Sequence, residues 1–251
     1  MINPFLPASR LARVCQMIVD AVFPRRCVGC DLSRKNGGDF LCGLCRDDIF
    51  MIDDPLCNTC GTPADIDYDY PEDGFDCGLC RKGGYRFDRA RSFGLYHSVL
   101  RELIHFYKYR NQPGAIGEIE PLLRQYFEPR RREYQGYAVA SVPLHVRKLK
   151  ARGFDQSFIL AHCIAEILEL PLLVRPVKRI RETDPQTRKS RFERSINVKG
   201  AFAIEAPEEI RHRSILLVDD VFTTGSTVNE VTRVLKKADA KAIQVFTLAR
   251  A

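Results

Sequence analysis

The sequence predicts an α/β fold, with a mainly parallel sheet carrying helices on both faces and a small cysteine-rich module before it. Three observations indicate this. From about residue 85 onward, apolar strand-like segments alternate with amphipathic helical segments. Four Cys-x-x-Cys pairs stand ahead of that alternation. A hydrophobic strand over 215–218 runs into a turn rich in hydroxyl side chains and then into a helix.

At 251 residues, the chain is long enough for one such domain and a smaller module. It contains 45% hydrophobic and 28% charged residues, and no apolar run approaches the ~18 residues that a membrane span needs. This composition excludes fibrous, disordered and membrane-embedded proteins. Residues 1–90 hold 11 Lys or Arg and 14 Asp or Glu, whereas the other 161 residues hold 28 and 18. The positive charge of the C-terminal part favours polyanionic partners such as phosphorylated metabolites or nucleic acid.

The N-terminal stretch 1–24 is predicted to contain an amphipathic helix. Leu11, Val14, Ile18 and Val22 are spaced to form one helical stripe, and polar residues interrupt the apolar run between them. No small-x-small cleavage site follows, which argues against a secretory signal peptide. We therefore expect a cytoplasmic protein without membrane insertion.

Eight of the ten cysteines form Cys-x-x-Cys pairs that are separated by 11, 11 and 16 residues. The pairs are Cys27/Cys30, Cys42/Cys45, Cys57/Cys60 and Cys77/Cys80. Two thiolates of one pair can reach a single ion from a tight turn, and two pairs complete a tetrahedral sulfur shell around Zn²⁺. The eight cysteines predict two structural zinc ions, with no coordination position left open for catalysis.

Other interpretations of the cysteines are less favoured. A disulfide framework needs an oxidising compartment, and evenly repeated pairs favour four-thiolate zinc sites over an iron–sulfur cluster. The sequence leaves the pairing open, since neighbouring pairs could share an ion or the first and third pairs could share one in a cross-braced arrangement. Few large apolar residues lie between the pairs, so the module, taken as residues 25–84, is expected to need metal to fold.

The remaining residues, 85–251, are predicted to form the α/β domain. The expected strands are 91–96, 137–142, 215–218 and 242–248, with a further apolar segment at 172–174. The expected helices have apolar stripes over 99–107, 158–168 and 228–235. The basic stretch 175–199 is expected to form a flexible hood that carries Arg188, Arg191 and Arg194. Ligands of such sheets bind beyond the carboxyl ends of the strands.

The most informative segment, 215–227, reads Ile-Leu-Leu-Val-Asp-Asp-Val-Phe-Thr-Thr-Gly-Ser-Thr. Successive amide groups and hydroxyls around 223–227, together with the positive end of the following helix, can enclose a phosphate. Asp219 and Asp220 stand at the strand end, where their carboxylates can accept hydrogen bonds from vicinal hydroxyls. A ribose 5-phosphate fits both halves of this segment.

In this segment the chain resembles the type I phosphoribosyltransferases. Their motif for 5-phosphoribosyl 1-diphosphate (PRPP) is a hydrophobic strand, two acidic residues and a Thr-rich phosphate loop. The resemblance implies a type I phosphoribosyltransferase-like fold that binds PRPP with Mg²⁺. It also implies that Asp219 and Asp220 form the catalytic pair and hold the ribose hydroxyls. The 5-phosphate would be held by Thr223, Thr224, Gly225, Ser226 and Thr227.

Further segments narrow the resemblance to one family. They are Val142-Pro143-Leu144-His145, the residues Arg147 and Lys150, the run 152–157 (Arg-Gly-Phe-Asp-Gln-Ser), Gln186-Thr187, Arg194 and the run 197–202 (Asn-Val-Lys-Gly-Ala-Phe). With the four cysteine pairs, they resemble the ComF family, competence-associated proteins that join a zinc module to a phosphoribosyltransferase-like domain. The resemblance implies Arg147, Lys150, Arg152, Gln156 and Arg194 as ligand-binding residues. Family members usually carry Asn where Asp155 stands here, and Leu where Lys189 stands.

The ComF resemblance implies an accessory factor of natural transformation that helps to handle incoming single-stranded DNA, with a helicase-like competence ATPase as partner. The alternative is an active phosphoribosyltransferase in nucleotide salvage or related metabolism, and a third possibility is a PRPP sensor or scaffold without catalysis. The sequence favours binding over turnover, because it shows no evident pocket for an acceptor base.

Overall fold

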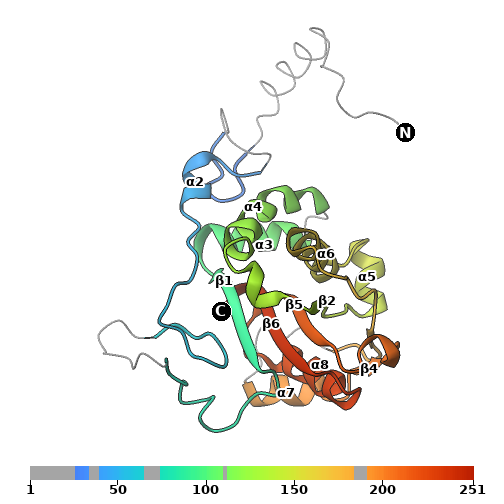
Figure 1. Ribbon diagram of the computed structural model, residues 1–251. Helices are drawn as coiled ribbons and strands as arrows, with labels where there is room; N and C mark the ends of the chain where they lie inside the picture. Colours follow the sequence, from blue (N-terminus) through green and yellow to red (C-terminus); the bar gives the residue numbers. More distant parts are fainter. Residues whose placement is uncertain (1–25, 34–39, 65–73, 110–111, 184–190) are drawn as a thin grey trace.

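The structure, a computed structural model, describes residues 26–33, 40–64, 74–109, 112–183 and 191–251 (Figure 1). Within these ranges the side chains of Tyr109, Arg191, Phe192, Arg194 and Ser195 are not described. The helix expected within 1–24 lies outside the described residues, as do Arg188, Lys189 and the Gln186-Thr187 pair.

Four parallel strands form the central sheet in the order β1-β6-β5-β2. Their bounds are Arg89–Leu95 for β1, Tyr137–Ser141 for β2, Ser214–Phe222 for β5 and Ala242–Arg250 for β6. Strands β5 and β6 lie at the centre, and residues 215–218 of β5 form an unbroken buried apolar run. Such a run is typical of a parallel strand that is covered on both faces.

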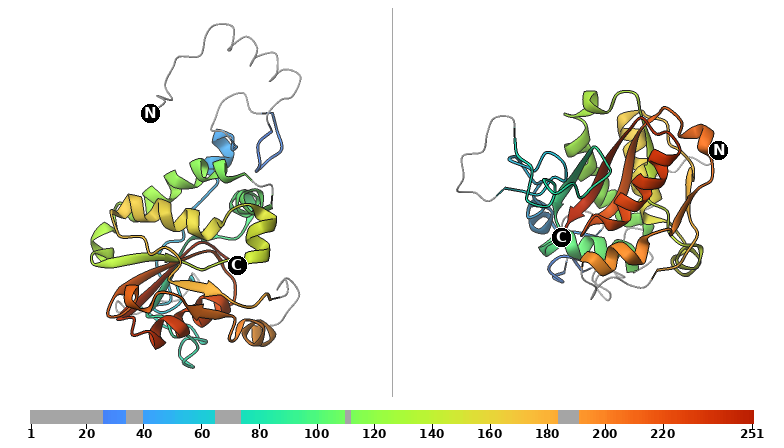
Figure 2. Two further views of the ribbon diagram at one scale, coloured as in Figure 1. Left: turned by 90° about the vertical axis from the view of Figure 1, so that its right-hand side faces the viewer. Right: turned by 90° about the horizontal axis from the view of Figure 1, so that it is seen from below.

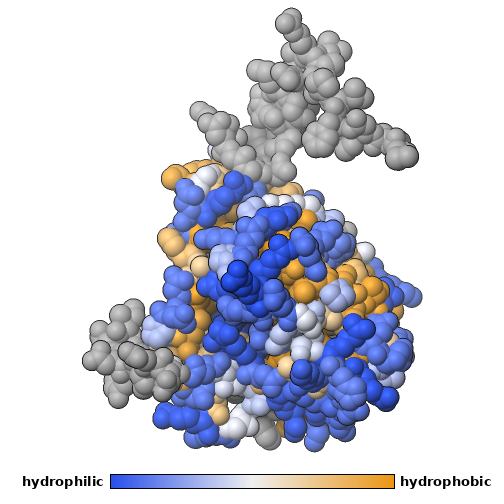
Figure 3. All heavy atoms as spheres, in the orientation of Figure 1, coloured by the Kyte–Doolittle hydropathy of each residue, from blue (hydrophilic) through white to orange (hydrophobic). Residues whose placement is uncertain are grey.

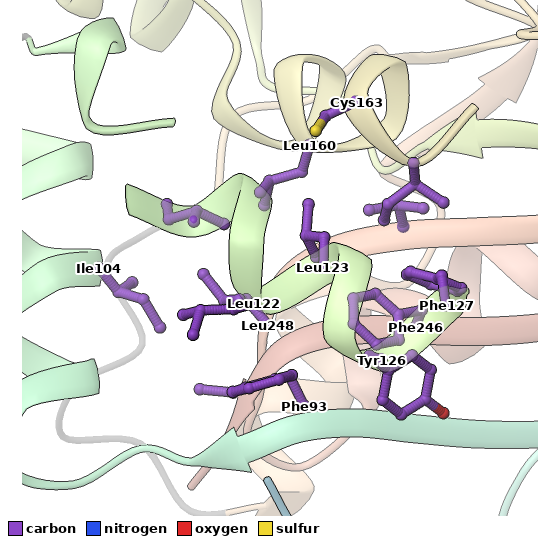
Figure 4. Packing of buried hydrophobic residues seen from close by; sticks show 14 of the residues in the cluster. Phe93, Ile104, Leu122, Leu123, Tyr126, Phe127, Leu160, Cys163, Phe246 and Leu248 are labelled. Atoms are coloured by element: carbon purple, nitrogen blue, oxygen red, sulfur yellow. The ribbon is translucent and has the colours of Figure 1, made fainter. Parts of the chain in front are cut away.

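Helices cover both faces of this sheet, which confirms the predicted fold class (Figures 1 and 2). On one face lie α3 (Ser98–Tyr109), α4 (Ile116–Phe127) and α6 (Gln156–Leu168), which pack onto Phe93, Phe246 and Leu248 of the strands. Figure 4 shows side chains of α4 inserted between those of α3, α6 and the sheet. On the other face lies α8 (Ser226–Lys237), with α7 (Arg191–Val198) beside it.

Several elements differ from the sequence expectation. Helix α4 and the short helix α5 (Val146–Arg152) were not foreseen, nor was a second, two-stranded antiparallel sheet of β3 (Val177–Arg179) and β4 (Phe202–Ile204). Within the described part of the basic stretch, the chain forms β3 and α7. The apolar segment 172–174 contributes only an isolated bridge between Leu172 and Val139. The described residues also form three 3-10 turns, at Pro113–Ala115, Arg131–Tyr134 and Pro207–Glu209.

The cysteine-rich module carries the short helix α2 (Gly43–Asp47) and continues along the outer edge of the sheet beside β1 (Figure 1). The amide of Ile52 donates to the carbonyl of Phe93, and the amide of Ala90 donates to the carbonyl of Thr59. These bonds cover an edge that would otherwise expose unpaired backbone groups. Hydrophobic residues gather on the surface over α2, where Leu44 is exposed, while hydrophilic residues cover most of the face in Figure 3. Among the described residues, no helix combines the length and apolar character that crossing a bilayer demands.

Candidate metal centres and ribose-phosphate site

The eight paired cysteines gather into two four-sulfur clusters. Cys27, Cys30, Cys42 and Cys45 form the first centre, Cys57, Cys60, Cys77 and Cys80 form the second, and the sulfurs of each lie within 4.8 Å of one another. Neighbouring pairs therefore share a centre, which answers the pairing question that the sequence left open. No disulfide occurs among the described cysteines.

The geometry of both clusters fits zinc. The Sγ atoms of Cys30 and Cys42 are 3.9 Å apart, and those of Cys60 and Cys77 are 3.7 Å apart. Four sulfurs at about 2.3 Å from one ion stand about 3.8 Å from each other in a tetrahedron. Backbone amides of Cys42 and Cys77 each donate to a cluster sulfur at 3.3 Å, which stabilises thiolate. These are two structural zinc sites.

Glu118 of α4 anchors the first centre. Its buried carboxylate accepts hydrogen bonds from the amides of Phe40 at 2.8 Å and Leu41 at 3.2 Å, and pairs with Arg46 of α2 at 2.5 Å. Burial alone would raise the pKa of Glu118, but the hydrogen bonds from Phe40, Arg46 and Leu41 outweigh it and hold the pKa below its usual value. Sequence reasoning missed this residue, because its partners lie more than 70 positions away along the chain.

The two acidic residues of the predicted ribose site lie near the carboxyl end of β5. The hydroxyl of Ser157 in α6 donates to Asp219 Oδ1 at 2.9 Å, and Lys108 Nζ of α3 pairs with Asp220 Oδ1 at 2.8 Å. Burial, with a smaller contribution from the adjacent Asp220 carboxylate, raises the pKa of Asp219 to about 7. A cation beside this carboxyl favours its ionised form, as Lys108 does by lowering the pKa.

The predicted phosphate loop connects β5 to α8. Gly225 caps α8 in a left-handed conformation with φ of 71°. The hydroxyls of Thr224 and Ser226 lie 2.8 Å apart, and the Ser226 amide points at Thr224 Oγ1 at 3.4 Å. Thr223 is exposed, and Ser226 and Thr227 are the first two residues of α8. The loop thus presents hydroxyls and the positive end of a helix immediately after the acidic pair.

The residues predicted to contact the diphosphate follow β2. Arg147 lies in α5 and pairs with Glu182 at 3.1 Å, and Lys150 is exposed on the same helix. Arg152 Nη1 donates to Gln156 Oε1 at 3.0 Å, and the Gln156 amide reaches the carbonyl of Lys108 at 3.5 Å. Gln156 is buried, and through these contacts it joins the end of α3 to α6. Arg194 lies in α7, and its side chain is outside the described part of the chain.

Asp155, which departs from the family pattern, has a structural role in this chain. Its Oδ1 accepts from the Phe158 amide at 3.1 Å and caps α6, and its Oδ2 accepts from the Leu144 amide at 3.2 Å. Burial raises the pKa of Asp155. Because it accepts both hydrogen bonds, the Asp155 carboxylate holds the loop after β2 against α6.

Two cavities adjoin this region. One of about 720 Å³ lies beside the loop after β2, and its largely apolar wall includes Leu144, Phe154, Phe158 and Val177. The other, of about 560 Å³, opens at the phosphate loop; Tyr85, Arg86, Lys199, Thr224, Ser226 and Arg233 are among the residues that line it. No sequence pattern indicated either cavity, because each is lined by segments that lie far apart in the chain. Lys108, Ser157 and Tyr85 were missed at the site for the same reason.

Comparison with known proteins agrees with this architecture. A double zinc ribbon domain matches residues 18–82, and a phosphoribosyl transferase domain matches residues 155–251. Competence protein F of Haemophilus influenzae is 33% identical to the chain over 91% of its length and 98% of the relative. The chain belongs to the ComF family. Other ComF relatives are DNA utilization protein YhgH of Escherichia coli, 31% identical over 90% of the chain and 97% of the relative, and Competence protein ComFC of Bacillus subtilis, 24% identical over 84% of each.

Proposed function

We propose that this ComF protein binds PRPP with Mg²⁺ at the carboxyl end of β5 and acts in the cytoplasm as an accessory factor that handles incoming single-stranded DNA. One observation supports PRPP as the ligand. The paired carboxylates of Asp219 and Asp220 are followed, after the last two residues of β5, by a hydroxyl-rich loop that Gly225 joins to the N-terminus of α8. Polyol recognition and phosphate recognition thus stand side by side, as ribose 5-phosphate requires.

Each group of the ligand has a candidate partner. Asp219 and Asp220 would hold the ribose hydroxyls and, through them, Mg²⁺. Residues 223–227 would hold the 5-phosphate, and Arg147, Lys150, Arg152 and Arg194 would provide positive charge for the diphosphate. Bound Mg²⁺ would offset negative charge on the diphosphate.

Lys108 and Ser157 contact the carboxylates of the acidic pair. In the absence of ligand, the Lys108 ammonium compensates the charge of Asp220, and the Ser157 hydroxyl orients the Asp219 carboxylate. Ligand with Mg²⁺ would compete with Lys108 for Asp220. It would also release the proton that Asp219 holds near neutral pH, because a nearby cation lowers a carboxyl pKa.

Titration calorimetry with PRPP and Mg²⁺ tests the ligand assignment. We expect clear binding by the wild type and, because both ribose contacts are lost, at least a 100-fold loss of affinity in Asp219→Ala/Asp220→Ala. Zinc content should stay at two ions per chain. Glu208→Ala, which removes an exposed carboxylate elsewhere, is the matched control and should bind as the wild type does. Equal affinity in the double variant and the wild type would remove the site assignment.

The DNA role is supported by the names of the relatives, which refer to competence and to DNA utilization, and by the basic balance of residues 91–251. We expect fluorescence anisotropy to show retention of a single-stranded oligonucleotide that weakens steeply as salt rises, because phosphate contacts release counterions. A duplex of the same length is the control. Absence of binding at 50 mM salt, or binding insensitive to salt, would contradict the proposed role.

An active phosphoribosyltransferase is the second candidate. The apolar cavity of about 720 Å³ favours it, because the cavity adjoins the loop proposed for the diphosphate and could admit a planar acceptor. Release of diphosphate from PRPP upon addition of an acceptor base distinguishes this candidate from binding alone.

A further inference from the structure

Tyr85 connects the second metal centre with the phosphate loop. It lies five residues after Cys80, in the segment that leads from the cysteine module into β1. Its hydroxyl donates to the carbonyl of Thr224 at 3.0 Å. Its ring stacks on Phe87 with centroids 4.7 Å apart and meets the edge of Phe222 at 5.9 Å. A residue of the metal module's exit segment therefore holds the backbone of the loop directly.

The loop fits closely against these rings. A Cβ at Gly225 would stand 2.5 Å from Phe222 Cζ and 2.7 Å from Tyr85 Cε1. Phe222 is 2% exposed and ends β5, so it cannot move without disturbing the core. The position of the Tyr85 and Phe222 rings thus fixes where the backbone of residues 224–226 runs.

Arg250 makes a second connection from the same centre. One of its guanidinium nitrogens donates to the carbonyl of Cys60 at 2.7 Å, and the other donates to Thr62 Oγ1 at 2.6 Å and reaches Cys60 Sγ at 3.6 Å. The guanidinium carbon lies 4.6 Å from the centre of the Phe222 ring. One cation thus contacts a metal ligand of the second centre and the aromatic ring beneath the phosphate loop.

The second centre is also part of the domain core. Cys57 is 0% exposed and Cys60 is 2% exposed, and both belong to the apolar cluster that contains Phe222 and the buried face of α8. The first centre is anchored elsewhere, by Glu118 at the start of α4 on the opposite face of the sheet. The two centres therefore differ in what they support.

We propose that the metal ion of the second centre holds the phosphate loop in its binding conformation, with Tyr85 and Arg250 as positioning residues. Loss of that ion frees the Cys57–Cys80 segment, which removes the anchors of Arg250 and Tyr85 and lets the loop shift. Loss of the ion from the first centre leaves the contacts of Arg250 and Tyr85 intact. The inference rests on the proposed binding of PRPP, and it predicts that metal occupancy of the second centre controls affinity for the 5-phosphate end of the ligand.

Calorimetry with three probes tests the positioning role of Tyr85: PRPP with Mg²⁺, ribose 5-phosphate, and pyrophosphate with Mg²⁺. We expect Tyr85→Phe, which removes one hydroxyl and keeps all eight cysteines, to lower the affinity for ribose 5-phosphate and for PRPP by about five- to tenfold. Pyrophosphate should bind as it does to the wild type, since it reports on the loop after β2. If Tyr85 had a merely structural role, its substitution would lower the affinity for all three probes or for none.

A second experiment replaces one metal-binding cysteine of each centre in the full chain and compares the two variants. Cys80→Ser should lower the zinc content to one ion per chain and lower the affinity for ribose 5-phosphate more than tenfold. Cys30→Ser should also lose one ion yet bind ribose 5-phosphate as the wild type does. If Cys80→Ser fails to fold, Tyr85→Phe and Arg250→Gln decide, because both retain every metal ligand.

The outcomes separate the two proposals. If the wild type binds none of the probes, the proposed ligand is wrong and the inference falls with it. If the wild type binds PRPP but Tyr85→Phe and Arg250→Gln bind ribose 5-phosphate equally well, the ligand stands and the positioning role is overturned. Equal losses in Cys80→Ser and Cys30→Ser would likewise overturn the special role of the second centre.

Discussion

Glu118→Ala is expected to lower the free energy of unfolding by about 2–3 kcal/mol, because it removes a buried hydrogen-bond acceptor whose ion-pair partner, Arg46, is 41% exposed. The substitution leaves the amides of Phe40 and Leu41 and the guanidinium of Arg46 without the carboxylate that now satisfies them. Urea denaturation followed by circular dichroism measures the loss. The first metal centre should detach from α4 and zinc there should become accessible to a chelator.

Glu120→Ala is the matched control on the same helix. Glu120 pairs with Arg124 at 2.8 Å on an exposed surface, where such pairs contribute about 0–1 kcal/mol. If the two variants lost equal stability, Glu118 would not anchor the module.

The stabilising effect of Glu118 should depend on pH in one direction. The folded-state pKa of its carboxyl lies below the unfolded value, so its contribution is present above the unfolded pKa and is lost as the pH falls through the folded one. The stability difference between wild type and Glu118→Gln should therefore shrink on acidification below about pH 4. A difference that grew in acid would contradict the low pKa.

Features that depend on neighbouring residues could be predicted from the sequence. The Cys-x-x-Cys spacing predicted two four-sulfur clusters, since both cysteines of a pair reach one ion from a single turn. The segment 215–227 likewise predicted a buried strand, a phosphate loop and a helix, because the whole unit is contiguous.

Contacts between distant segments could not be predicted in this way. Nothing in the helical pattern around Lys108 indicates that its ammonium meets Asp220, which is 112 positions further along the chain. Glu118 and Tyr85 gain their roles only when α4 and the exit segment of the metal module dock onto the domain. Helix α4 was itself missed, and it contains Pro121, which obscures a helical pattern.

Gly225→Ala is expected to weaken PRPP binding by at least tenfold. The left-handed conformation at this position disfavours any side chain, and the added Cβ would collide with Phe222 and Tyr85 at 2.5 and 2.7 Å. Because Phe222 is buried in the core and Tyr85 is held by its hydrogen bond to Thr224 and its stacking on Phe87, the loop itself must move, and its amides and hydroxyls then no longer enclose the phosphate. Calorimetry with PRPP and Mg²⁺ measures the loss of affinity.

Gly136→Ala separates conformational strain from collision. Gly136 has φ of 80°, similar to that of Gly225, but a Cβ there would meet nothing within 4 Å. It should lower stability by about 1 kcal/mol through strain while leaving PRPP affinity unchanged. If Gly225→Ala lost stability to the same extent and kept its affinity, the loop would tolerate displacement, and close packing against Tyr85 and Phe222 would not determine phosphate binding.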